Sequence, residues 1–162
     1  MSLTENPSQS VNLPELVEFR PEMADELITM WRRSFNRALA PYKDPHSFAE
    51  HREFLLKVLI NRSDVTVAQH EETIIGFMAQ AGENIEQLYL HVNHQSQGVG
   101  SQFIDLAKSA SPARLHLFTF QRNLKARRFY KKHGFREINY GYMNKEGLAD
   151  VELEYLPSDQ LG

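Results

Sequence analysis

Two glycines lie in a polar stretch, 91–103 (HVNHQSQGVGSQF), between the apolar run 88–90 and a helical pattern. A helix that begins at Gly98 points its unpaired N–H groups and the positive end of its dipole back towards the preceding strand. Gly98 and Gly100 carry no Cβ that would keep a phosphate away, and Ser101 adds a hydroxyl donor. The stretch predicts a site for a phosphate-bearing ligand, although a Gly-x-Gly pair also occurs in plain strand-to-helix turns.

Two common phosphate-binding motifs do not fit this stretch. A P-loop requires Lys and then Ser or Thr after its second glycine, whereas Ser101 and Gln102 follow Gly100. A dinucleotide fingerprint requires a small residue where Phe103 stands and an acidic residue about twenty positions on, where 117–120 reads LFTF. The sequence therefore excludes a P-loop and argues against a dinucleotide-binding oxidoreductase.

Another motif does fit, and it is carried by two separate stretches. Residues 95–100 (QSQGVG) resemble the signature of GNAT-superfamily N-acetyltransferases: Gln or Arg, two residues, Gly, one residue, then Gly or Ala. Residues 123–135 (NLKARRFYKKHGF) are similar to the family's later pattern of Asn, Tyr and Gly-Phe, and 18–26 (EFRPEMADE) resembles its Arg-Pro helix start. The resemblance spans about residues 16–155 and extends to an uncharacterised bacterial subgroup, which usually has Pro where Ala149 stands.

The resemblance implies that acetyl-CoA is the acyl donor. Backbone groups of the strand 88–90 would bind the pantetheine arm where this strand separates from 115–120. The loop 95–101 would hold the pyrophosphate, and Asn123 would hydrogen-bond the pantetheine or a nearby phosphate. The cofactor-binding residues implied in this way are Leu88, Tyr89, Leu90, Gln95, Ser96, Gln97, Gly98, Val99, Gly100, Ser101, Asn123 and Tyr130.

Tyr130 is the general acid that the resemblance implies. Because the ordinary pKa of tyrosine is about 10, Tyr130 would keep its proton at neutral pH and transfer it to the departing CoA thiolate. Without the motif, its place beside Phe129 and Ala126 would indicate a core aromatic.

Glu86 is a candidate base for removing a proton from the acceptor amine, with Glu83 and an ordered water as alternatives. A bulge in this strand would change the face that Glu86 takes, so alternation alone does not place its carboxylate. A solvated carboxylate at a strand end is the simplest interpretation.

The chain contains no cysteine, which excludes disulfides, thiolate metal ligands and an acetyl-cysteine intermediate. The acetyl group would then pass directly to a primary amine in a ternary complex. The resemblance implies an acceptor cleft near 36–46 and 142–150. Three carboxylates near it, Glu83, Glu86 and Asp150, favour a small cationic amine or amino-acid derivative over a protein lysine. A non-catalytic acyl-CoA-binding or sensor module is the alternative, against which the retained Tyr130 argues.

Two further clusters have simpler explanations. His91 and His94 are followed by no third and fourth ligand at a recognisable spacing, so we expect no metal. A basic segment without acidic residues would suit nucleic acid, but the net charge of the chain is −3, which favours a solvated helix face. Its cations, of which Lys125 or Arg128 would meet the CoA 3′-phosphate, are Arg122, Lys125, Arg127, Arg128, Lys131 and Lys132.

The elements that must position these residues follow from the apolar pattern. A chain of 162 residues with 41% hydrophobic residues predicts one globular domain, 14–156, between polar tails at 1–13 and 157–162. Apolar residues recur at helical spacing in 21–38, 48–59, 99–110 and 126–133. Strands are predicted at 17–19, 65–68, 73–78, 87–92, 115–120, 135–140 and 151–155.

The order β-α-α-β-β-β-α-β-α-β-β predicts an α/β (mixed α+β) fold. The resemblance implies a single GNAT-like domain with a mostly antiparallel central sheet and about four flanking helices. No apolar run approaches the roughly 18 residues of a membrane span, and the N-terminus lacks the apolar segment of a secretory signal. We therefore expect a cytoplasmic protein with no membrane or nucleic-acid partner, as a monomer or homodimer.

Overall fold

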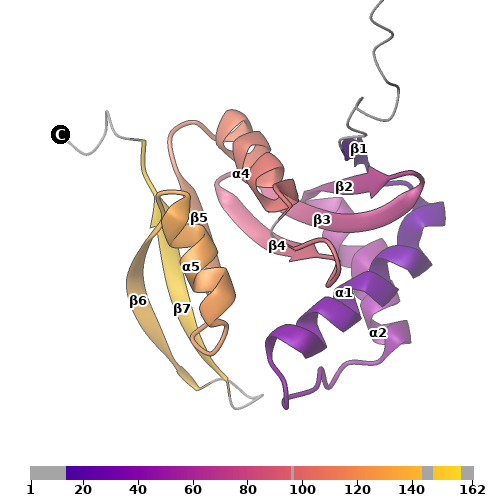
Figure 1. Cartoon of the computed structure of the whole chain (residues 1–162), viewed down its shortest axis with the longest axis horizontal. Coiled ribbons are helices and arrows are strands. Elements are labelled where there is room, and N and C mark those ends of the chain that lie inside the picture. The colour runs from indigo at the N-terminus through magenta and orange to yellow at the C-terminus, as the bar shows by residue number, and fades with distance from the viewer. Residues whose placement is uncertain (1–13, 96, 144–147, 158–162) are drawn as a thin grey trace, which may run out of the picture.

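The computed structural model of the protein describes residues 14–95, 97–143 and 148–157. One sheet of seven strands forms the centre of these residues, and helices cover it (Figure 1). The strands are β1 (Glu15–Glu18), β2 (Asp64–His70), β3 (Thr73–Ala81), β4 (Asn84–Leu90), β5 (Leu115–Phe120), β6 (Arg136–Met143) and β7 (Ala149–Tyr155). The helical elements are η2 (Pro21–Met23), α1 (Ala24–Ala38), α2 (Phe48–Phe54), η3 (Leu55–Leu59), α3 (Ile60–Arg62), α4 (Val99–Ala110) and α5 (Leu124–Lys132).

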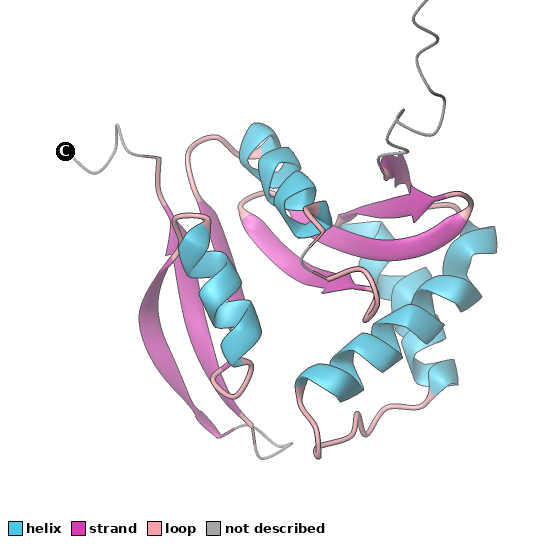
Figure 2. Cartoon of the chain, in the orientation of Figure 1, coloured by secondary structure: helices cyan, strands magenta, loops and turns pink. Residues whose placement is uncertain are grey.

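The predicted element order and the mostly antiparallel sheet are confirmed. The strands lie in the order β1-β2-β3-β4-β5-β7-β6, and every neighbouring pair is antiparallel except β4 and β5. These two parallel strands pair at one position, Asn84 with His116, where the His116 N–H also donates to the Glu83 carbonyl at 2.8 Å. Beyond this point β4 and β5 separate, so the sheet consists of a first arm, β1–β4, and a second arm, β5–β7–β6 (Figure 2).

Each face of the sheet has its own apolar core. On the face of α1 to α3, side chains such as Leu27, Ile28 and Phe77 are fully buried. On the opposite face, Phe103 and Ile104 of α4 are fully buried against the sheet and α5. None of the described helices has the length and apolarity needed to cross a membrane.

The second predicted helix is longer than its apolar stripe indicates. The capping box of Ser47 and Glu50 begins it at Phe48, as predicted, and a π-helical turn at η3 carries it on through α3 to Arg62. The apolar stripe ends at Leu59 because Asn61 and Arg62 are exposed. This extra turn places Arg62 beside β4, where its Nε donates to Glu86 at 2.8 Å.

Candidate active site

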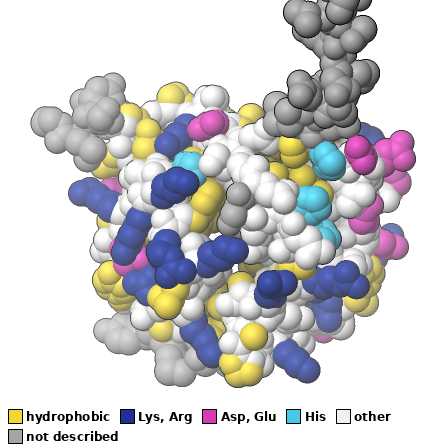
Figure 3. All heavy atoms as spheres, viewed as in Figure 1, with side chains coloured by type: hydrophobic (Ala, Val, Ile, Leu, Met, Phe, Trp, Pro, Cys, Tyr) yellow, Lys and Arg dark blue, Asp and Glu magenta, His cyan; other side chains and the backbone are white. Residues whose placement is uncertain are grey.

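A cavity of about 870 Å³ lies between the separating strands β4 and β5. Its walls are β4 from Ile85 to Leu90, the end of β5 from Leu117 to Phe120, the last turns of α1, and α5. Lysine and arginine side chains surround the hollow on the face that Figure 3 shows. Because β4 and β5 do not pair along this length, their facing backbone groups are available to a ligand.

The two glycines of the predicted phosphate loop are required for different reasons. Gly98 precedes α4 with φ of 87°, a left-handed conformation that favours glycine, and a Cβ there would meet nothing within 4 Å. At Gly100 a Cβ would lie 2.8 Å from Cζ of Phe129, so the absence of a side chain lets α4 and α5 approach. The predicted start of this helix near Gly98 is confirmed, and Gly98, Gly100 and Ser101, where the N–H groups lack partners within the helix, line the cavity.

The loop before α4 is tied to both sides of the cavity. Gln95 donates to the Leu90 carbonyl at 3.4 Å and accepts from Nζ of Lys125 on α5 at 2.8 Å. The Ser101 hydroxyl lies 3.1 Å from Nε2 of His133, just beyond α5. The loop and α5 therefore form one continuous polar wall.

Three other residues of the predicted loop contribute differently. Gln97 is exposed, and its side chain contacts Nδ1 of His94 at 3.1 Å within the loop. Val99 is 1% exposed, so its side chain belongs to the core and its backbone alone could reach a ligand. Ser96 lies outside the described residues.

Tyr130 is buried in the wall of the cavity that α5 forms. Its ring packs edge-on against Phe129 and Phe135, with centroids 5.2 and 5.4 Å apart. Burial, with a smaller contribution from Tyr89, raises the pKa of Tyr130 above its ordinary value. Its proton is consequently retained at neutral pH.

The three predicted β4 residues divide between the two faces of the sheet. Leu88 and Leu90 pack against the core beneath α4 and α5. Tyr89 faces α1 and lies between Trp31 and Phe77, at centroid distances of 5.9 and 6.1 Å. Burial raises the pKa of Tyr89 to about 12, so this phenol also stays protonated.

A bulge in β4 decides where Glu86 points. Ala79 of β3 pairs with Gln87 and the next residue, Gln80, pairs with Ile85, which leaves Glu86 as an extra residue. Its carboxylate is 21% exposed and binds Arg62 at 2.8 Å. The alternative base, Glu83, lies at the meeting point of β4 and β5 and pairs with Arg114 at 3.4 Å. Both carboxylates therefore carry an arginine partner.

Asn123 occupies the N-cap of α5. Its Oδ1 accepts from the Ala126 N–H at 3.1 Å, which satisfies one of the unpaired donors of the helix. No described residue accepts a hydrogen bond from its Nδ2, and the side chain lines the cavity. The cap thus orients an amide donor towards the space between the strands.

The basic segment of the sequence splits into two groups. Arg127 and Lys131 pair with Glu137 of β6, at 2.7 and 3.6 Å. The remaining cations, which line the cavity, are Arg122, Lys125, Arg128 and Lys132. The solvated-face interpretation is therefore incomplete, because helical spacing does not reveal which neighbours the segment meets.

The structure also brings together residues that the sequence pattern did not reveal. Ser34, Phe35 and Arg37 of α1 line the cavity, and the Phe35 ring contacts Phe120 edge-on at 6.0 Å. No local signal distinguishes this part of α1 from any amphipathic helix. The contact depends on segments some 85 residues apart, so only the tertiary structure shows it.

A buried hydrogen bond between His51 and Asp44 fixes the loop between α1 and α2, in the predicted acceptor region 36–46. Nε2 of His51 lies 2.7 Å from Oδ2 of Asp44, with side chains 7% and 4% exposed. Burial lowers the pKa of His51, and Asp44 opposes this effect. Asn36 accepts from the Asp44 N–H at 2.8 Å, so the loop is anchored at both ends. In the other predicted region, 142–150, residues 144–147 lie outside the described residues.

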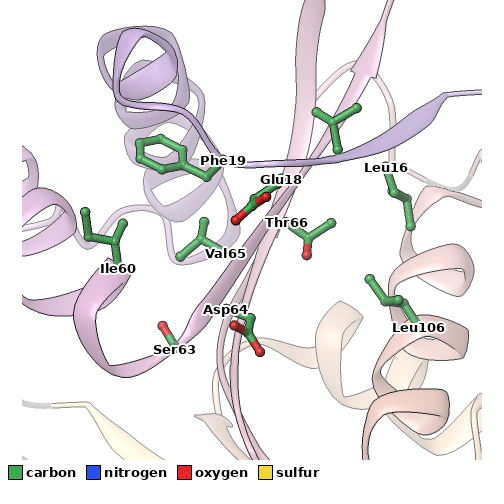
Figure 4. Close-up of a pocket in the computed structure, with 10 residues that line it drawn as sticks. Leu16, Glu18, Phe19, Ile60, Ser63, Asp64, Val65, Thr66 and Leu106 are labelled. Atoms are coloured by element: carbon green, nitrogen blue, oxygen red, sulfur yellow. The ribbon is translucent and has the colours of Figure 1, made fainter.

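Among the described residues, no three His, Cys, Asp or Glu side chains are grouped so as to hold a metal ion. The His91 and His94 rings contact each other at 5.1 Å, and their nitrogens bind neighbours in the same loop. A smaller hollow, of about 470 Å³, lies along the edge strand β1 and its neighbour β2 (Figure 4). None of the predicted site residues lines it, which leaves the cavity between β4 and β5 as the candidate site.

Comparison with known proteins gives a consistent result. A family model described as an acetyltransferase (GNAT) domain matches residues 61–137. The peptidyl-lysine N-acetyltransferase YjaB of Escherichia coli is 30% identical over 123 residues, which cover 72% of this chain and 78% of that protein. Its namesake in Salmonella typhimurium is 28% identical over 117 residues, covering 72% and 79%.

Solved structures share the fold. The apo-form solution structure of E. coli YjaB superposes with a TM-score of 0.73 at 23% identity, over 90% of this chain and 99% of that one. The PaiA N-acetyltransferase of Thermoplasma acidophilum, solved in complex with coenzyme A, superposes with a TM-score of 0.68 at 18% identity, covering 89% and 99%. The separated central strands thus belong to a fold shared with acetyltransferases.

Proposed function

The chain belongs to the GNAT family of acetyltransferases, and from this premise we propose that it transfers the acetyl group of acetyl-CoA directly to a primary amine. The observation that carries the proposal is the buried, protonated Tyr130 in the wall of a cavity bordered by unpaired strand edges and the N-terminus of α4. The coenzyme A bound by the PaiA enzyme supports the choice of donor. The absence of cysteine favours direct transfer over an acetyl-enzyme.

The donor would be held by backbone and polar groups along the whole cavity. N–H groups at the start of α4 and the Ser101 hydroxyl suit the pyrophosphate. The free edges of Leu88 to Leu90 and the Nδ2 donor of Asn123 suit the pantetheine amides. Lys125 and Arg128 suit the 3′-phosphate, since both line the cavity on α5.

In the reaction, the neutral amine attacks the acetyl carbonyl carbon, and a C–N bond replaces the C–S bond. Tyr130 donates its proton to the departing thiolate, which leaves as CoA–SH. Glu86 is the proposed acceptor of the amine proton: its Oε2 binds Arg62, and its Oε1 has no described partner. Most of the rate enhancement would come from positioning the two substrates.

The acceptor we propose is a small amine or amino-acid derivative, as the sequence predicts. A lysine side chain of a protein is the second candidate, because the YjaB relatives are named peptidyl-lysine N-acetyltransferases. A panel of small amines and lysine peptides, with CoA thiol release as the readout, separates the two.

Replacement of Tyr130 by Phe tests the mechanism. We expect kcat to fall about 100-fold, because a positioned acid contributes roughly 10² to 10⁴ in rate, while the Kd of acetyl-CoA stays within about twofold. Tyr155→Phe is the matched control, since Tyr155 packs against Phe135 on β7 and does not line the cavity. Unchanged turnover in Tyr130→Phe would remove this residue from its role.

A thermal-shift comparison tests the alternatives to catalysis. Stabilisation by acetyl-CoA without thiol release from any amine would indicate an acyl-CoA-binding or sensor module. Stabilisation by NAD(P) and none by acetyl-CoA would indicate the dinucleotide-binding alternative.

A further inference from the structure

An aromatic contact crosses the open end of the cavity. Phe35 of α1 meets Phe120, the last residue of β5, with ring centroids 6.0 Å apart and planes at 89°. Both rings line the cavity. The wall formed by α1 is therefore joined to the second arm of the sheet at this point.

An arginine lies two residues after each of these rings. Arg37 follows Phe35 and Arg122 follows Phe120; both are exposed and both line the cavity. Neither forms an ion pair with any other residue that the structure describes. The lining of the cavity thus contains two cations without an ion-pair partner among the described residues.

Among the described residues that line the cavity, lysines and arginines outnumber carboxylates. Glu86 is the one carboxylate among the described residues of its lining, and Arg62 neutralises it at 2.8 Å. Glu83, at the meeting point of β4 and β5, is paired in the same way with Arg114 at 3.4 Å. Two of the three carboxylates in the sequence argument for a cationic acceptor, Glu83 and Glu86, are thus paired with an arginine, and the third, Asp150, does not line the cavity.

The cations of α5 are connected to the donor loop. Lys125, Arg128 and Lys132 recur at i, i+3 and i+7, so they share one helix face. Lys125 binds Gln95, and the neighbour of Lys132, His133, contacts Ser101. These three cations suit the phosphates of the donor. No hydrogen bond or ion pair joins Arg37 or Arg122 to the described residues of that loop, so these two cations are left without a role.

We propose that Arg37 and Arg122 bind a carboxylate of the acceptor, so that the second substrate is a small amine that also carries a carboxylate. The proposal rests on the acetyltransferase function above and specifies its acceptor. Arginine forms paired, charge-assisted hydrogen bonds with carboxylates, and both guanidinium groups lie in the lining of the cavity. An anchored carboxylate also directs the amine at the other end of the molecule towards the acetyl group.

The test compares ω-amino acids of increasing chain length with their carboxamides, which keep the amine and remove the negative charge. We expect the best acid to exceed its carboxamide at least about tenfold in kcat/KM, a typical loss for a missing charge-assisted hydrogen bond. Arg37→Gln and Arg122→Gln should each lower kcat/KM for the acid about tenfold, while the value for the carboxamide and the Kd of acetyl-CoA stay within about twofold. Arg33→Gln is the matched control, because Arg33 is exposed one turn earlier on α1 and does not line the cavity.

The outcomes separate this inference from the proposed function. Equal kcat/KM for acids and carboxamides, or transfer to lysine peptides alone, overturns the carboxylate-bearing acceptor and leaves the acetyltransferase function intact. If no amine is acetylated, the proposed function fails. Calorimetric titration of the acids in the presence of CoA then decides the inference: binding that is lost in Arg37→Gln supports it, and no binding overturns it.

Discussion

The first arm of the sheet, β1 to β4, lies between α1–α3 on one face and α4 on the other, whereas the second arm, β5, β7 and β6, is covered by α5. Phe77 in the first arm is fully buried, and Phe118 in the second arm is 60% exposed. Apolar burial stabilises the first arm, so the free energy that keeps it folded comes from many non-directional contacts. The second arm also buries apolar residues, among them Leu117 and Leu153, but the exposed ring of Phe118 contributes little to its stability.

Ion pairs supply part of the missing stabilisation in the second arm. Glu137 of β6 binds Arg127 at 2.7 Å and accepts from the Tyr140 hydroxyl at 2.6 Å. Glu154 of β7 binds Arg114 and Arg136, both at 3.0 Å. Such contacts are directional and sensitive to pH. The wall of the cavity that carries Tyr130 therefore combines an apolar core with ion pairs between α5 and the strands, whereas apolar burial dominates in the first arm.

The largest change in the free energy of unfolding is expected for a substitution in the first arm. Phe77→Ala removes a fully buried ring, and we expect a loss of about 3–5 kcal/mol in the free energy of unfolding. Phe118→Ala, the same change in the second arm, should cost no more than about 0.5 kcal/mol. Urea unfolding of both variants measures the difference, and equal losses would show that the two arms are not stabilised differently.

A smaller change in the free energy of unfolding is expected when the ion pairs between α5 and β6 are removed. Arg127, followed by Tyr140, lowers the pKa of Glu137 from 4.5 to about 2, and the side chain is 4% exposed. Since the folded carboxyl binds a proton more weakly than the unfolded one, its stabilisation is present above pH 4.5 and is lost as the pH falls towards 2. Glu137→Gln should cost about 1.5–3 kcal/mol at pH 7.

Urea unfolding at neutral and acidic pH checks this prediction, because the variant should lose less stability than the parent protein between pH 4.5 and about 2. Glu22→Gln, which removes an exposed pair with Arg20, is the control and should change little. Parallel pH profiles for Glu137→Gln and the parent would contradict the role given to this pair.

The smallest of these changes in the free energy of unfolding is expected at Gly100, where α4 of the first arm contacts α5 of the second arm. Gly100→Ala would place a Cβ 2.8 Å from Cζ of Phe129, and a small shift of the ring should limit the cost to about 1 kcal/mol. Since Phe129 belongs to α5, its shift also moves this helix away from the loop 95–101. We therefore expect the KM of acetyl-CoA to rise several-fold. In the double variant with Phe129→Leu, the free energy of unfolding and the KM of acetyl-CoA should both return most of the way to the parent values. A KM that stays high in the double variant would indicate that the added methyl group itself hinders acetyl-CoA.

Much of the fold could be predicted from the sequence, including every strand, the helices that flank the sheet and the start of α4 at Gly98. These features arise from local patterns: apolar periodicity, capping residues and glycines. The donor-site residues come from the resemblance of residues 95–100 and 123–135 to the GNAT signature, and their roles stay predictions. The extension of α2 through a π turn to Arg62 was missed because apolar spacing carries no sign of it.

The sequence by itself determined the order of the elements, the glycine loop and the position of Tyr130 on its helix, because each depends on residues only a few positions apart. Only the tertiary structure decided that a bulge turns Glu86 towards Arg62, that Asp44 and His51 anchor the loop after α1, and that Arg37 and Arg122 line the same cavity. These arrangements join segments that are distant along the chain. Their geometry follows from how the two arms pack, which no local pattern encodes.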